Sequence, residues 1–317
     1  MISKCTYVLL AAILVGSGSA AAANKIKVVT SIPDLAWVAA EIGGELVTAK
    51  SLLRGTENPH FVDAVPEFTR LVAEADVVCL VGLDLEVGYM PPVLARSGNA
   101  QVQPGGKGYC EAGKGVTALE KPTGSIDRSM GDVHPHGNPH FYLSPKALAE
   151  SAAVIATTLS AVDSVHAAQY QKGLAAFVTS MNSLAEEVSA RLKPLRDAQN
   201  AAGKALIMEY HQEFNYFFEQ YGLKSFASVE EKPGVPPAAG RLGSLATSAK
   251  ASGVRVVLAT DYNPAGTLRR FRELSGVKQV VVPTMIQPNG TYKSYSDLQR
   301  HIADSLVGLA VGGKLQK

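Results

Sequence analysis

Three histidines in separate segments of the chain could bind one transition metal. His60 stands in GTENPHF, His140 in GNPHFYLSP and His211 in MEYHQEF. The segments around His60 and His211 place these two residues at the ends of predicted strands. Neutral imidazole is a preferred ligand of zinc, so histidines at strand ends predict a metal site that is assembled by folding. The alternative is a set of ordinary surface and core histidines, because the chain has seven of them.

Patterns typical of buried strands and of helices alternate along the chain. Short apolar runs at residues 26–34, 47–53 and 77–83 are separated by helical segments, and residues 99–130 are expected to be loop. About 50 residues from Ser144 onward contain almost no Gly or Pro, and they predict a helix of about 30 residues, about 45 Å long. Four more strand–helix units follow it. Parallel βαβ units on both sides of one long helix predict an α/β protein with two lobes.

The order of these elements gives the domain boundaries and places the histidines. We expect a signal peptide over residues 1–23, an N-terminal lobe over 24–163, a linking backbone helix over 164–197 and a C-terminal lobe over 198–317. In open parallel sheets the ligand crevice lies outside the carboxyl ends of the strands. One histidine from each of three segments, drawn from both lobes, therefore predicts a metal site in the interlobe cleft.

The first residues predict export. Lys4 is followed by the apolar run Tyr7–Val15 and by the small residues GSGSAAAAN, which is the arrangement of a secretory signal peptide. Cleavage is expected near residues 20–24 and gives a periplasmic protein, and no later segment is apolar enough to span a bilayer. A formal charge of +2 falls to +1 when Lys4 is removed, so charge gives no argument for nucleic acid. We expect a monomer. Export also allows a disulfide between Cys79 and Cys110, which the sequence alone does not establish.

The chain resembles a known family. GTENPHF and VGLDLEVGYMP, then GNPHFYLSP, then MEYHQEFNYFFEQYGL occur in the order and spacing of the metal-binding solute-binding proteins of ABC importers, in the zinc and manganese group. The resemblance covers essentially the whole mature chain. It implies two mainly parallel four-stranded α/β lobes bridged by a backbone helix, with a metal held between them by His60, His140 and His211. It also implies delivery of the metal to a membrane permease, with no enzymatic turnover.

The fourth metal ligand departs from the family pattern. Many members supply an Asp from the loop after the last strand, but here that loop reads VVVPTMIQPNGTYKSYSD and has no acid before Asp297. Water, Asp261, Glu230 or Glu231 could fill the position. Three neutral imidazoles favour Zn(II) over manganese, which prefers more carboxylate oxygen, but they do not exclude copper. Family members thought to prefer manganese carry an acid where this chain has His211, which also points to zinc.

Four further histidines and one pair of acids leave alternatives open. His134 and His136 lie beside proline and glycine, and both are expected to be exposed on a loop that binds a second zinc weakly, hands zinc to the main site, or is merely polar. His166 and His301 are expected to be structural or surface residues. An exported zinc hydrolase with Glu209 or Glu213 as general base is one alternative function. A periplasmic zinc metallochaperone is another, and it differs only in its partner.

Overall fold

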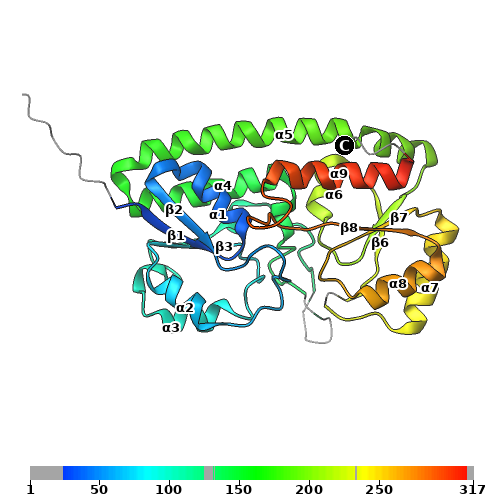
Figure 1. The fold of residues 1–317 in the computed structure, drawn as a ribbon, viewed down its shortest axis with the longest axis horizontal. Helices are drawn as coiled ribbons and strands as arrows, with labels where there is room; N and C mark the ends of the chain where they lie inside the picture. Colours follow the sequence, from blue (N-terminus) through cyan, green and yellow to red (C-terminus); the bar gives the residue numbers. More distant parts are fainter. Residues whose placement is uncertain (1–23, 125–130, 132, 233, 313–317) are drawn as a thin grey trace, which may run out of the picture.

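The computed structural model describes residues 24–124, 131, 133–232 and 234–312, which form two lobes joined by a long helix (Figure 1). The predicted signal peptide lies outside the described residues. Among the residues that are described, no helix combines the length and the apolar character needed to cross a membrane.

The N-terminal lobe contains a sheet of four parallel strands in the order β2-β1-β3-β4. Every residue of β3 is buried, as expected for an apolar strand inside a parallel sheet that helices cover on both faces. The strands are β1 (Ile26–Thr30), β2 (Val47–Ser51), β3 (Val77–Leu80) and β4 (Tyr109–Glu111), and the helices are α1 (Pro33–Gly43), α2 (Pro66–Ala73), α3 (Met90–Ser97) and α4 (Pro145–Val162).

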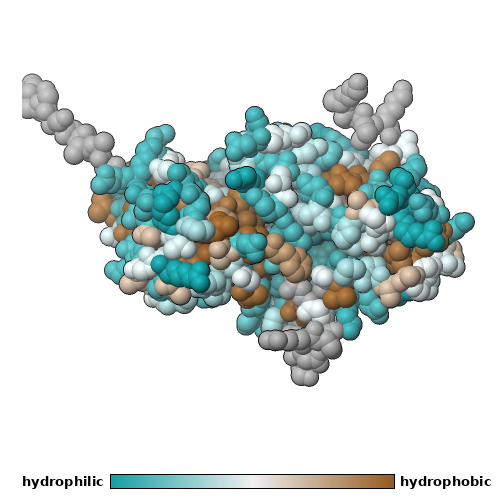
Figure 2. All heavy atoms as spheres, turned by 60° about the horizontal axis from the view of Figure 1, so that its bottom comes forward, coloured by the Kyte–Doolittle hydropathy of each residue, from teal (hydrophilic) through white to brown (hydrophobic). Residues whose placement is uncertain are grey.

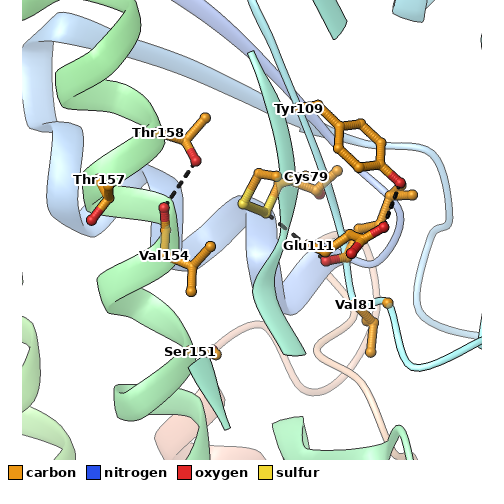
Figure 3. Close-up of a disulfide and its surroundings, with 12 residues drawn as sticks. Cys79, Val81, Tyr109, Glu111, Ser151, Val154, Thr157 and Thr158 are labelled. Carbon is orange, nitrogen blue, oxygen red and sulfur yellow. Dashed lines mark hydrogen bonds between the residues drawn. A yellow bond between two sulfur atoms is a disulfide. The ribbon is translucent and has the colours of Figure 1, made fainter. Parts of the chain in front are cut away.

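The edge strand β4 lies inside residues 99–130, where we expected only loop, so that expectation was wrong. Three residues are too few to show a periodic pattern, and Cys110 was the one signal available. Cys79 of β3 and Cys110 of β4 are paired in the register of the sheet and form a disulfide, with 4.4 Å between their Cα atoms. Both cysteines are buried, and the sulfur atoms face α4 (Figure 3). The disulfide therefore fastens a very short strand to the sheet.

The C-terminal lobe repeats the arrangement with the order β6-β5-β7-β8, again all parallel. In each lobe the first strand lies between the second and the third, which places the switch point of the sheet beside that first strand. The strands are β5 (Ile207–Glu209), β6 (Ser225–Ser228), β7 (Val256–Ala259) and β8 (Lys278–Val281), and the helices are α6 (Asn215–Tyr221), α7 (Ala239–Ser252), α8 (Ala265–Ser275) and α9 (Tyr295–Val311). The prediction of two parallel four-stranded lobes is confirmed.

The long helix α5 (Ala167–Ala202) has 36 residues and is about 54 Å long. It runs along one long side of the molecule and packs on α1 and α4 of the N-terminal lobe and on α9 (Figure 1). Its buried stripe includes Phe177, Met181, Leu184 and Val188, which recur at the three- and four-residue steps of a helix. The exact division of the chain into lobes stays a prediction.

The lobes also meet at contacts made by α1 and α9, away from the histidines, and we call these contacts the rear seam. The ring of Tyr295, the first residue of α9, stacks on that of Trp37 in α1 with 5.3 Å between the centroids. The Tyr295 hydroxyl donates to the carbonyl of Tyr142 at 2.8 Å, and Gln299 Nε2 donates to the carbonyl of Leu143 at 2.9 Å. Because Tyr295 and Gln299 are both fully buried, these contacts form a continuous part of the interior.

A second part of the rear seam is formed by Ile286, which follows β8. Its backbone N–H donates to the carboxyl group of Asp34 in α1 at 3.2 Å. Its carbonyl approaches Gly55 so closely that a Cβ atom on residue 55 would lie 2.1 Å from the oxygen, and Gly55 has φ +94°. Only glycine fits this position. The backbone of the loop after β2 is thereby held directly against the C-terminal lobe.

Candidate metal site

The structure brings His60, His140 and His211 together where the loops of the two lobes meet. One ligand atom from each lies within 4.8 Å of those from the other two, and the ring centroids are 5.0, 5.3 and 5.4 Å apart. The Nε2 atoms of His60 and His140 are 2.9 Å apart. Two imidazole nitrogens on one tetrahedral zinc are about 3.3 Å apart, given Zn–N bonds of about 2.0–2.1 Å. The spacing of the three rings therefore suits a single ion.

His60 lies in the loop between β2 and α2 and is half-buried. Its backbone N–H donates to Asn58 Oδ1 at 3.0 Å, and the N–H of Phe61 donates to the Asn58 carbonyl at 3.1 Å. Asparagine commonly shapes a turn by accepting a hydrogen bond from the backbone two residues on. The segment Asn58-Pro59-His60 is thus a local turn that presents the imidazole.

His140 occupies a second Asn-Pro-His segment and begins a short helix of the 3-10 type, His140–Leu143. Asn138 Oδ1 accepts the backbone N–H of His140 at 2.9 Å and lies 2.8 Å from its ring Nδ1. The Nδ2 atom of Asn138 donates to Glu120 Oε2 and to the carbonyl of Gln212, both at 2.8 Å. Since the amide oxygen is the acceptor, His140 carries its proton on Nδ1 and its lone pair on Nε2. That is the tautomer a metal ligand needs.

His211 follows β5 in the C-terminal lobe and is 8% exposed. Its Nδ1 lies 2.8 Å from Glu230 Oε2, a carboxylate that also accepts the N–H of Gly234 at 3.0 Å. A carboxylate that accepts from Nδ1 again leaves the lone pair on Nε2. Both buried histidines are therefore oriented through Nδ1, one by an amide and the other by a carboxylate.

The surroundings of the cluster favour neutral imidazoles. Burial, followed by the positive charge that His60, His211 and His134 would carry, holds the pKa of His140 well below its usual value of 6.5. His140 is therefore unprotonated at neutral pH. Because its Nε2 carries the lone pair, the 2.9 Å contact is a hydrogen bond from Nε2–H of His60 in the metal-free protein. A metal ligand needs a lone pair on Nε2, so binding through this atom requires the neutral His60 ring to carry its proton on Nδ1 instead.

A cavity of about 190 Å³ opens beside the cluster and contains a carboxylate that sequence reasoning considered only as a catalytic base. Its lining includes His60, His211, Glu230, Glu213 and Tyr262. Glu213 is 1% exposed, and burial raises its pKa to about 7. The Tyr262 hydroxyl donates to Glu213 Oε1 at 3.1 Å, while Glu213 Oε2 has no hydrogen-bond partner.

The other acids considered for the fourth ligand have different surroundings. Glu230 is engaged with the Nδ1 side of His211, and Glu231 is exposed, with its carboxylate 3.8 Å from Arg241. Asp261 is exposed and is absent from the lining of the cavity, to which Tyr262 contributes instead. In the loop after β8, the hydroxyl of Thr284 lies 3.0 Å from that of Tyr262.

Sequence reasoning also missed Asn138 as the support of His140. The signal for it was the Asn-Pro-His sequence that is repeated around His60 and His140.

The two loop histidines point to different places. His136 is exposed, and its Nδ1 lies 2.6 Å from Asp84 Oδ2. His134 is half-buried, and its ring centroid lies 5.1 Å from that of His60 and 6.4 Å from that of His140. The expectation that both imidazoles are exposed was therefore wrong for His134. The reason is the fold of the intervening turn, which a pattern of Pro and Gly does not specify.

The remaining described histidines lie in other surroundings, as expected. His166 Nδ1 contacts Asp163 Oδ2 at 2.7 Å near the start of α5, and the ring of His301 in α9 stacks against Tyr292 at 4.5 Å. The face on which the loops of the two lobes gather shows apolar and polar side chains interspersed rather than one continuous apolar area (Figure 2).

Each lobe contains a parallel four-stranded sheet, one long helix connects the lobes, and three histidines meet between them. These features define a two-lobe protein with a candidate metal site. The sequence profile of the ZnuA family, described as zinc-uptake complex component A, periplasmic, matches residues 28–308. The chain belongs to this family. The family consists of substrate-binding proteins of ABC transporters, which are not enzymes, and the hydrolase alternative is set aside.

Curated relatives carry names for two different metals. The chain is 26% identical over 276 residues to the high-affinity zinc uptake system protein ZnuA of Brucella abortus, covering 76% of this chain and 78% of the relative. It is 24% identical over 309 residues to the manganese ABC transporter substrate-binding lipoprotein PsaA of Streptococcus mitis, covering 96% of each.

Two solved structures show the same fold. A crystal structure of ZnuA is similar with a TM-score of 0.72 at 22% identity, covering 90% of this chain and all of that one. The solute-binding protein FpvC of Pseudomonas aeruginosa in complex with Mn²⁺ has a TM-score of 0.76 at 22% identity, covering 91% and 99%. At this identity the similarity establishes the architecture only.

Proposed function

We propose that this protein captures Zn(II) between its two lobes through His60, His140 and His211 and delivers it to the membrane permease of an ABC importer. The observation that carries the proposal is the convergence of three imidazoles from both lobes, with the two buried rings held through Nδ1 by Asn138 and Glu230. Such outer partners fix the tautomer and raise the basicity of metal-binding histidines. We further propose that the protein acts in the periplasm as a monomer, after its signal peptide is removed near residues 20–24.

The choice of zinc follows from the chemistry of the donors. Three neutral imidazoles suit zinc, whereas manganese prefers carboxylate and water oxygens. The zinc-uptake relative of Brucella abortus agrees with this choice, and the manganese-transport relative of Streptococcus mitis makes selectivity the property to measure. Copper(II) is the strongest competitor, because in the general affinity order it binds to imidazole ligands more tightly than zinc does.

The experiment is a calorimetric titration of chelator-stripped protein with zinc, manganese and copper. We expect one tight zinc site and a weaker response to manganese. His60→Ala, His140→Ala and His211→Ala should each weaken zinc binding by roughly 100-fold or more, because the roughly 10–16 kcal/mol of a zinc site is shared among about four ligands. The matched control is His166→Ala, which removes an imidazole that lies against Asp163 instead. Tight binding that survives all three substitutions would disprove the assignment of ligands.

Delivery to a permease is tested in cells that lack the gene and grow on limiting zinc. Wild-type protein should restore zinc uptake, and His140→Ala should not. If uptake is unchanged without the protein while exported zinc enzymes lack their metal, the partner is another exported protein, and the metallochaperone alternative is correct.

A further inference from the structure

A tetrahedral zinc needs one donor more than the three histidines provide. On such an ion, ring centroids of neighbouring imidazoles are about 5 Å apart. The three pairs among His60, His140 and His211 have 5.0, 5.3 and 5.4 Å. His134 makes one more approach of this size, 5.1 Å to His60 with an angle of 36° between the rings.

We propose that His134 supplies the fourth imidazole, so that the metal is held by four histidines. The proposal rests on the proposed function, and it adds a ligand that comes from the loop preceding His140. The ring of His134 lies 6.4 Å from that of His140, which is wider than the 5.4 Å between His140 and His211. His134 lies outside the group of three whose ligand atoms are within 4.8 Å of one another, so coordination requires it to move toward His140 and His211.

The turn that contains His134 explains why it, and not His136, faces the cluster. Residues His134, Pro135, His136 and Gly137 form a turn closed by a hydrogen bond from Gly137 N–H to the His134 carbonyl at 3.1 Å. Proline at the second position and glycine at the fourth are favoured in such turns. Gly137 has φ +108°, and a Cβ atom there would lie 2.7 Å from the Cβ of Ala118. The tight packing of Gly137 fixes where the turn ends.

On the outer side of the turn, Asp84 holds His136 away from the cluster. The ring Nδ1 of His136 lies 2.6 Å from Asp84 Oδ2, and its backbone N–H lies 3.4 Å from the same oxygen. Pro135 and His136 are exposed, so the tip of the turn has room to move. Two residues apart in sequence, His134 and His136 therefore have different tasks: one faces the three histidines, and the other fastens the turn to the N-terminal lobe.

Glu213 is the competing donor, because its buried Oε2 has no hydrogen-bond partner and it lines the same cavity as His60 and His211. Its other oxygen accepts a hydrogen bond from Tyr262, which in turn contacts Thr284. Glu213 is buried and its Oε1 is held by Tyr262, so its carboxylate has less freedom to move toward the ion. His134 needs only a movement of a half-exposed turn, and a fourth imidazole keeps the donor set uniform.

The test is zinc K-edge X-ray absorption on full-length mature protein loaded with one equivalent of zinc, combined with zinc titration of variants. Multiple scattering from imidazole rings counts the histidines on the ion. We expect four in the wild type and three in His134→Ala. Loss of a group that is hydrogen-bonded to a metal ligand typically lowers metal affinity by roughly 10- to 100-fold. Loss of a ligand itself should lower zinc affinity by at least this factor. The matched control, His166→Ala, removes an imidazole that lies against Asp163 and should retain four imidazoles and the wild-type affinity. His136→Ala is the second loop variant, and thermal unfolding of the metal-free variants verifies the fold.

Three outcomes would overturn the proposal. A wild-type count of three that is unchanged in His134→Ala removes His134 from the site, and a lower affinity of Glu213→Gln would then identify the carboxylate. A second zinc equivalent that is lost in both loop variants would assign the loop a separate site. Failure of the proposed function itself looks different, because His140→Ala and His211→Ala would then leave tight binding intact or the wild type would show none.

Discussion

The metal site and the rear seam both join the N-terminal lobe to the C-terminal lobe, but they do so with different groups. The metal site brings together His60, His140 and His211 beside a cavity of about 190 Å³. The rear seam instead stacks Tyr295 on Trp37 and buries the hydrogen bonds around them. Under the proposed function, the first junction depends on a cation that can enter and leave, whereas the rear seam is made when the chain folds.

This difference suggests how the protein responds to its metal. The rear seam and α5 hold the two lobes on one rigid frame, so a large hinge motion would break buried contacts. The His60 loop is fixed at Gly55 against Ile286, while His60 itself stays half-buried. We infer that binding and release reorder the loops around His60 and His134 locally, and that the permease senses those loops.

The largest expected effect comes from breaking the rear seam. Tyr295→Ala removes a fully buried aromatic ring, and we expect the free energy of unfolding to fall by about 3–5 kcal/mol. Tyr295→Phe keeps the ring and loses only the hydrogen bond to Tyr142, which should cost about 1 kcal/mol. Chemical denaturation of the metal-free proteins measures both. Equal losses in the two variants would show that the stack on Trp37 contributes little.

The disulfide stabilises the N-terminal lobe but takes part in neither junction, so its removal serves as a comparison for the variants of the metal site and of the rear seam. Cross-linking Cys79 to Cys110, 31 positions apart, should contribute about 3–4 kcal/mol by restricting the unfolded chain. The double variant Cys79→Ala, Cys110→Ala should therefore unfold more easily and still bind zinc with wild-type affinity. Reductant should lower the stability of the wild type and leave the double variant unchanged. A large loss of zinc affinity would mean that β4 helps to position the histidines.

The sequence predicted those elements whose residue pattern extends over many positions, and it missed those that are only a few residues long. The two parallel sheets and α5 follow from patterns that extend over many residues, such as the helical spacing from Phe177 to Val188. The strand β4 has only three residues and gave no pattern, and its place is fixed by the disulfide of Cys110.

The candidate metal site also contains residues that the sequence identified and residues that it did not. The histidines stood out because imidazole is a specific metal ligand, and their residue type and segment order identified His60, His140 and His211 as candidates. Glu213 and the inward direction of His134 depend on how turns and side chains pack in three dimensions. The direction of a side chain cannot be recognised from a pattern in one sequence. The repeated Asn-Pro-His, however, indicated that Asn138 supports His140.

Asp34 makes the rear seam sensitive to pH. Burial raises the pKa of its carboxyl group from 3.8 to about 7, although the N–H of Ile286 opposes the shift. Between these values the folded protein holds a proton that the unfolded chain has lost, so the free energy of unfolding falls as pH rises toward about 7. Asp34→Asn does not titrate and can still accept the hydrogen bond. Its stability relative to wild type should therefore rise by on the order of 2 kcal/mol between about pH 5 and 8.

Denaturant unfolding of both proteins at several pH values measures this change. Glu86, whose pKa burial also raises to about 7, is present in both and cancels in the difference. A difference between wild type and Asp34→Asn that does not vary with pH would show that Asp34 is not protonated in the folded seam.

The smallest predicted effect concerns the metal site and should leave the seam untouched. Glu230 accepts a hydrogen bond from Nδ1 of His211, so Glu230→Gln removes the charge that strengthens this ligand. Zinc affinity should fall by roughly 10-fold, and by up to roughly 100-fold in Glu230→Ala, which removes the acceptor altogether. Stability of the metal-free protein should change far less than in Tyr295→Ala. The neighbouring Glu231→Gln is the control, because Glu231 is exposed and its carboxylate lies 3.8 Å from Arg241.

Calorimetric titration of these variants decides whether the two junctions are separable. If Glu230→Gln binds zinc as tightly as Glu231→Gln, the carboxylate does not tune His211, and the metal site depends on its imidazoles alone. If Glu230→Gln also lowers the unfolding free energy as much as Tyr295→Phe does, the hydrogen bond between His211 and Glu230 supports the fold as well as the metal. The metal-binding loops would then be part of the permanent frame, and release would require more than a local rearrangement.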